Sequence, residues 1–157
     1  MIGVRIKRAV AAAALVVWCA QPALAQGSKP ASNCPSPVVE AMHMRLLQTE
    51  LMVAALQCRN VPGNDFSVKY NNFIMQFGAP LTQNANVLKN HFKNQTQLDR
   101  YMTRIANDAG QRGHRPGFCQ DMQPVFEQVL ALKGGNELSK FSAKDPMSLG
   151  ISTRDGC

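Results

Sequence analysis

Met42, His43 and Met44 are the residues of this sequence whose types most suggest a specific chemistry. Thioether and imidazole groups are soft or borderline ligands that suit Cu(I). Adjacent helical residues point about 100° apart, so these three side chains do not easily converge on one ion. Methionine at helical spacing is usually core packing. We therefore predict no cofactor and keep a soft-metal, copper-binding role as the alternative.

A second group is basic and consists of Arg112, His114 and Arg115, in the stretch just before a predicted helix over 118–133. Positive side chains beside a helix N-terminus attract anions, because the first amide N–H groups of the helix are unpaired. These residues are a candidate site for an anion or a partner. The alternative interpretation is a solvated turn.

The residues needed for catalysis do not form a recognisable pattern. The three histidines, His43, His91 and His114, lie on different segments, and the ten acidic residues are spread singly along the chain. No nucleophile elbow, metal-binding His pair or phosphate-binding glycine loop occurs. We predict that the protein is not an enzyme, and an enzyme with an unrecognised site is the third hypothesis.

The first 25 residues have the three parts of a bacterial secretory signal peptide. Residues 1–8 carry three basic side chains, residues 9–20 are apolar, and residues 23–25 give a small-x-small cleavage pattern. A run of about 12 apolar residues is too short for a bilayer, which needs roughly 20. We expect a mature chain that starts at Gln26, does not span the membrane, and is periplasmic or secreted.

The composition of the mature chain excludes a nucleic-acid partner. Removal of residues 1–25 leaves 14 basic and 10 acidic residues, a net charge of +4. No run of basic residues interleaved with aromatic ones is present, and such a run is the usual mark of nucleic-acid binding.

Four cysteines remain after cleavage, and an even number in an exported chain predicts two disulfides. No Cys-x-x-Cys pair indicates a zinc site. We predict the pairing Cys58–Cys119 with Cys34–Cys157, because the sulfurs of Cys58 and Cys119 lie at the same level if their helices run antiparallel. If those helices run parallel, Cys34–Cys119 with Cys58–Cys157 is the alternative.

Amphipathic segments position these residues, and the first of them organises the rest. The stretch near 37–58 is apolar on nearly all sides, which predicts a central helix with Ser36 as N-cap and Pro37 at its first position. Further helices are predicted over 66–77, 80–93, 96–110 and 118–133. Pro124 favours a regular start of the last one near Gln123.

Two of these segments carry further expectations. The aromatic residues of 66–77 share one face, which predicts core packing. The face of 80–93 that carries Gln83, Asn84, Asn86 and Asn90 is expected to lie on the outside.

No strand-like alternation occurs, so we predict an all-α, disulfide-stapled bundle of about five helices around the central one. The signal peptide is followed by a flexible lead over 26–35, the bundle over 36–135, and an arm over 136–157 tethered by Cys157. We expect a non-catalytic protein that binds an unknown protein or envelope component.

Overall fold

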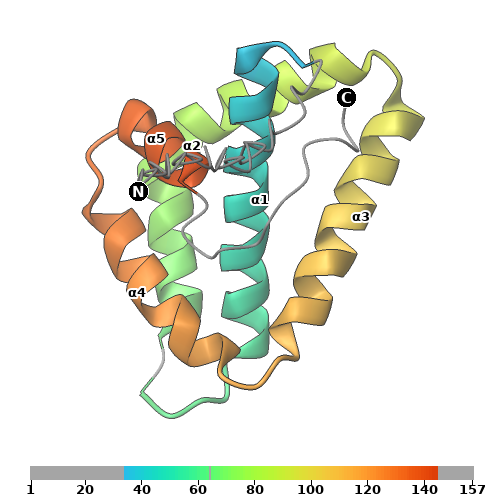
Figure 1. Cartoon of the computed structure of the whole chain (residues 1–157). Coiled ribbons are helices and arrows are strands. Elements are labelled where there is room, and N and C mark those ends of the chain that lie inside the picture. The colour runs from blue at the N-terminus through green and yellow to red at the C-terminus, as the bar shows by residue number, and fades with distance from the viewer. Residues whose placement is uncertain (1–33, 64, 145–157) are drawn as a thin grey trace, which may run out of the picture. The chain divides into compact units, whose positions relative to one another are not determined.

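Five α-helices and no β-strand make up the part of the chain that the computed structural model describes, residues 34–63 and 65–144 (Figure 1). The predicted all-α bundle of about five helices is confirmed. The helices are α1 (Ser36–Gln57), α2 (Phe66–Phe92), α3 (Gln95–Gly113), α4 (Phe118–Ala131) and α5 (Gly135–Ala143). None of the helices described has the length and hydropathy that a membrane-spanning segment requires.

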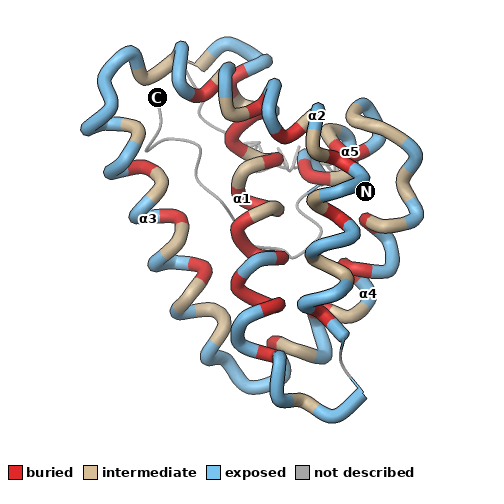
Figure 2. Tube along the Cα trace, turned by 180° about the vertical axis from the view of Figure 1, so that it is seen from behind, coloured by how far each residue is buried: buried red, intermediate tan, exposed pale blue. Residues whose placement is uncertain are grey.

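α1 is the central helix, as its sequence predicted. It contacts each of the other four helices, and 12 of its 22 residues are buried, so it has no wide solvent face (Figure 2). The predicted N-cap is wrong by one residue. Pro35 occupies the N-cap, and Ser36 is the first helical residue, whose hydroxyl donates to the carboxylate of Glu40 at 3.3 Å.

The core forms two clusters along α1. The larger joins the second half of α1 to the first half of α2, to α4 and to α5, and the rings of Phe66 and Phe126 stack in it at 4.8 Å. The smaller joins the first half of α1 to the second half of α2 and to α3. Phe66, Phe73 and Phe77 are each at most 1% exposed. The aromatic face predicted over 66–77 is therefore core packing.

α2 replaces the two separate helices predicted over 66–77 and 80–93. The helix continues across Gly78 and Pro80 with a kink at Phe77, whose φ of −113° and ψ of 16° are not helical. Pro80 lacks the N–H that would bond to the carbonyl of Gln76, and its ring crowds that carbonyl, which accounts for the kink. The two halves of α2 run in different directions (Figure 1).

The starts of α3 and α4 also differ from prediction. α3 begins at Gln95, one residue before the predicted start at Thr96, and its N-cap is Asn94, whose side chain accepts from the Thr96 N–H at 2.8 Å. α4 begins at Phe118 and contains Pro124. A regular start near Gln123 was therefore wrong, because the helix tolerates Pro124 in its middle, where the residue is exposed.

The end of α3 lies tightly against α1. A Cβ placed on Gly113 would lie 2.9 Å from Val53 Cγ1 and 3.0 Å from Gln57 Cγ, whereas a Cβ on Gly110 meets nothing within 4 Å. Gly113 is therefore a close-approach residue, and Gly110 is not.

α5 covers the first part of the stretch 136–157 that the sequence predicted as an arm, and it begins one residue earlier, at Gly135. It packs on α1 and places the fully buried Leu138 in the larger cluster. Residues 145–157, together with the predicted signal peptide and most of the predicted lead, lie outside the described residues.

The predicted disulfide Cys58–Cys119 is confirmed, with a Cα–Cα distance of 5.7 Å. Cys58 directly follows α1 and Cys119 lies in the first turn of α4, so the two helices run antiparallel as that pairing required (Figure 1). Cys34 is disulfide-bonded. Its predicted partner, Cys157, lies outside the described residues, so that pair stays a prediction.

Candidate functional site

An open cleft of about 660 Å³ is the strongest candidate site in the described part of the chain. We call it the α1–α2–α5 cleft, because the first half of α1, the second half of α2 and the α4–α5 connection with the start of α5 form its walls. Ligand sites usually have volumes of roughly 300–1,000 Å³. Its lining residues are Pro37, Glu40, Ala41, Met44, Pro80, Gln83, Asn84, Val87, Lys133, Gly134, Gly135, Asn136, Glu137 and Ser139.

Asn84 lines the cleft and is nevertheless only 6% exposed. Its Nδ2 group is buried and has no hydrogen-bond partner. An unpaired buried polar group costs about 1–3 kcal/mol, so most such groups in folded proteins are paired. The expectation that Asn84 lies on an outer polar face was wrong, although Gln83, Asn86 and Asn90 are exposed as predicted.

An exposed carboxylate lies in the same cleft. Glu40 accepts from the hydroxyl of Ser36 with Oε1 at 3.3 Å and from the hydroxyl of Ser139 with Oε2 at 3.1 Å. A carboxylate offers about four acceptor positions, so each oxygen retains capacity for a cation or an N–H donor.

The α4–α5 connection is held in place from α2. The side-chain amide of Gln76 donates to the carbonyl of Leu132 at 2.5 Å, and Glu137 accepts from the Lys133 N–H at 2.8 Å. A Cβ on Gly135 would lie 3.0 Å from Pro80 Cγ, so this wall depends on a glycine. The third wall of the cleft is thus positioned by contacts with α2 and within the connection itself.

The predicted copper ligands are not brought together. Met42 is fully buried in the smaller core cluster, Met44 is buried in the larger one, and His43 is partly exposed. Over residues 34–63 and 65–144, no group of three or more His, Cys, Asp or Glu side chains is placed to share a metal ion.

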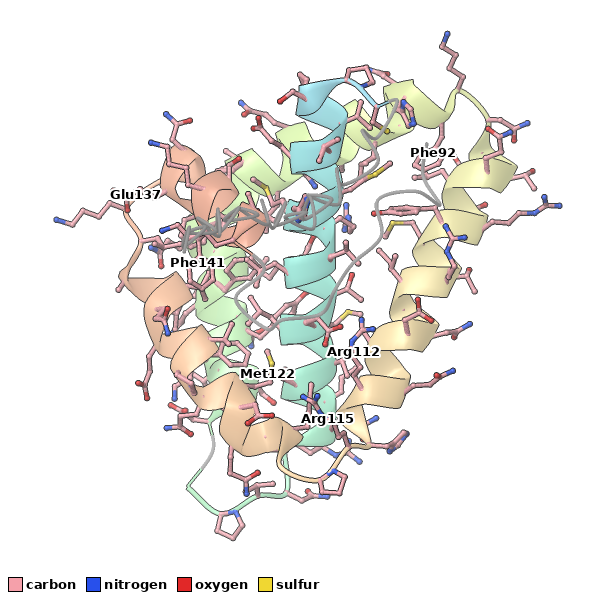
Figure 3. All side chains as sticks on the ribbon, in the orientation of Figure 1. Phe92, Arg112, Arg115, Met122, Glu137 and Phe141 are labelled. Carbon is pink, nitrogen blue, oxygen red and sulfur yellow. A yellow bond between two sulfur atoms is a disulfide. The ribbon has the colours of Figure 1, made fainter. Side chains whose placement is uncertain are left out.

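The basic residues of the predicted anion site have carboxylate partners. Arg112 is paired with Glu50 of α1, with 2.8 Å between Nε and Oε1, and Arg115 is paired with Asp121 at 3.2 Å. His114 is exposed. The two guanidinium groups are therefore neutralised within the chain, at the end of the bundle away from Glu137 (Figure 3).

Unpaired polar groups also occur between α1 and α3. Glu50 is 1% exposed, and its Oε2 has no partner. Burial raises the pKa of Glu50, and the hydrogen bond from Arg112 lowers it by a smaller amount. Tyr101 is 5% exposed with an unpaired hydroxyl, and burial raises the pKa of Tyr101 to about 12. Neither Glu50 nor Tyr101 belongs to the lining of the α1–α2–α5 cleft.

Sequence reasoning missed the cleft, because its walls come from segments far apart in the chain. The contact from Ser139 to Glu40 spans 99 residues. The one local signal is Pro80, which displaces the second half of α2 and so places Asn84 beside α1. Comparison of the chain with protein-family models, with curated proteins and with solved structures finds no match.

Proposed function

We propose that this chain is an exported, non-catalytic binding protein and that it holds its ligand in the α1–α2–α5 cleft. The observation that carries the proposal is Asn84, a buried residue that lines a ligand-sized cleft and whose Nδ2 group has no hydrogen-bond partner. Folding leaves this group unsatisfied, and a bound ligand satisfies it. Glu40 supports the proposal as a second polar group in the cleft, one that accepts from two hydroxyls and has further acceptor positions.

An oxidising compartment, the periplasm or the outside of a bacterial cell, is part of the proposal. The Cys58–Cys119 disulfide supports it, because such bonds persist mainly in exported proteins. Fractionation and mass determination of the natural protein test this. We expect a periplasmic or secreted chain that begins at Gln26, and an uncleaved cytoplasmic chain would contradict it.

The cleft itself is tested by blocking it from a residue on its exposed rim. Gln83→Trp places an indole at the opening of the cleft, and Asn86→Trp is the matched control, since Asn86 is exposed on α2 but does not line the cleft. Both variants are purified from their natural compartment, and retained small molecules are identified by native mass spectrometry. We expect a ligand on the wild type and Asn86→Trp but not on Gln83→Trp. Equal occupancy in the two variants would refute the proposal.

The copper alternative is not favoured, because the two thioethers of Met42 and Met44 belong to different core clusters.

A further inference from the structure

The chemistry of the α1–α2–α5 cleft restricts the class of ligand, and Asn84 is the first restriction. A side-chain amide carries both a donor and an acceptor in one plane. Its neighbours in the cleft lining include Ala41 and Met44, which are 3% and 7% exposed and offer no hydrogen bond from their side chains. Nδ2 is the atom without a partner, so it requires an acceptor, which an ammonium group lacks. A peptide bond offers this acceptor as its carbonyl oxygen, and its N–H can donate to the side-chain oxygen of Asn84. A carboxylate also offers an acceptor, but the charge of the lining, described below, disfavours it.

Apolar residues provide the second restriction. Water also offers a donor and an acceptor, so a ligand displaces it only by adding contacts that water does not make. Pro37, Met44, Pro80 and Val87 line the cleft and can contact aliphatic side chains on either side of a peptide bond. None of the described residues that line the cleft is aromatic, so among them a sugar ring finds no aromatic face to stack on.

Charge provides the third restriction. Among the described residues, the lining carries two carboxylates, Glu40 and Glu137, against the single ammonium group of Lys133. One oxygen of Glu137 accepts from the Lys133 N–H. Glu40 is held by two neutral hydroxyls and meets no cation in the described structure. Glu40 therefore favours a ligand with a positive group.

We propose that the cleft binds a short peptide segment, with Asn84 hydrogen-bonded to a peptide group and Glu40 holding an ammonium group. This inference rests on the proposed function and specifies its ligand. The ammonium group has two sources in peptides, a basic side chain and a free amino terminus. Both present the same chemistry to Glu40, and the probes below separate them.

Four defined probes are titrated into the disulfide-bonded, ¹⁵N-labelled protein, and amide shifts are followed by NMR. They are acetyl-Ala-Lys-Ala amide, acetyl-Ala-Glu-Ala amide, Ala-Ala-Ala amide with a free amino terminus, and maltotriose. We expect saturable shifts of the Asn84 side-chain amide with the lysine peptide, the free-amine peptide or both. The glutamate peptide should bind about tenfold more weakly or not at all.

Two variants assign the roles. Asn84→Leu should weaken the binding of the cationic peptide about tenfold or more, while its melting temperature rises, because the unpaired amide is gone. Glu40→Gln should remove the preference for the cationic peptide over the glutamate peptide. Asn86→Leu, on the same helix outside the cleft, is the control and should bind as the wild type does.

The outcomes separate this inference from the function it rests on. Undiminished peptide binding by Asn84→Leu would overturn the inference, and so would an absence of shifts with all three peptides. If maltotriose alone shifts cleft residues, the peptide assignment is wrong and the cleft remains a binding site. If Gln83→Trp also retains the natural ligand, the proposed function fails as well.

Discussion

Replacing Arg112 by methionine is expected to destabilise the fold in a strongly pH-dependent way. Arg112 is the only side chain that hydrogen-bonds Glu50 in the described structure, and Glu50 is 1% exposed. Burial already raises the pKa of Glu50 above its ordinary 4.5, and loss of Arg112 raises it further. Because the pKa of Glu50 is higher in the folded state than in the unfolded state, protonation of Glu50 stabilises the fold. This stabilisation is complete below pH 4.5 and is lost as the pH rises from 4.5 through the folded pKa.

The magnitude follows from the cost of keeping the buried carboxyl protonated. Removing one partner of a buried ion pair costs about 3–5 kcal/mol. Glu50 can instead take up a proton, and from an ordinary pKa of 4.5 this costs about 3.4 kcal/mol at pH 7. Burial already raises the pKa of Glu50 in the wild type, so part of this cost is present before the substitution. We therefore expect Arg112→Met to lose at most about 3 kcal/mol at pH 7, and the loss should shrink as the pH falls, by at most about 1.4 kcal/mol for each pH unit.

Urea denaturation followed by circular dichroism at pH 5, 6 and 7 measures this effect. Arg115→Met is the matched control, because Arg115 and Asp121 form an exposed pair, with side chains 56% and 63% exposed. Such pairs contribute about 0–1 kcal/mol. The double variant Glu50→Gln/Arg112→Met should lose the pH dependence. Equal losses from Arg112→Met and Arg115→Met, or a loss that does not change with pH, would refute the reasoning.

Four further variants test the stability of the fold by urea denaturation. Gly113→Ala should destabilise the fold, because the new Cβ would lie 2.9 Å from Val53 of α1. Gly110→Ala should stabilise it by about 0.5–1 kcal/mol, because its Cβ meets nothing within 4 Å. A Gly113→Ala variant more stable than Gly110→Ala would contradict the close approach of α3 to α1. Tyr101→Phe should stabilise the fold by about 1 kcal/mol, since the buried hydroxyl has no partner, and a loss of stability would mean that the hydroxyl is satisfied. The double alanine variant of Cys58 and Cys119 should lose about 4 kcal/mol, because the disulfide closes a separation of 61 residues, and an unchanged stability would show that the bond does not constrain the unfolded chain.

Patterns that are local in the sequence predicted the fold well. The all-round apolar stretch predicted the central position of α1. The places of Cys58 at the end of one helix and Cys119 at the start of another predicted their disulfide on the condition that the helices run antiparallel, a condition that the structure meets. Helix ends were less predictable, since several neighbouring residues can cap the same turn. Asn94 and Thr96 both suit an N-cap, and only the structure distinguishes them.

The candidate site was not predictable in the same way. Asn84 belongs to a run of amides that has the composition of an exposed face, and its burial depends on the kink at Phe77 and on α5. The sequence indicates neither the direction of that kink nor the packing of α5 on α1. Glu40 likewise meets Ser139 only through tertiary structure. A site assembled from three distant segments leaves no fixed spacing in the sequence.

The melting temperature of Asn84→Leu, with and without acetyl-Ala-Lys-Ala amide, tests the central claim most directly. Without peptide, the variant should melt above the wild type, because leucine removes an unpaired buried amide. Peptide at about ten times its dissociation constant should raise the wild-type midpoint by a few degrees and leave the variant unchanged. The assignment of Asn84 to ligand binding would be contradicted if the variant melted below the wild type. It would also be contradicted if the peptide raised the melting temperature of the variant as much as that of the wild type.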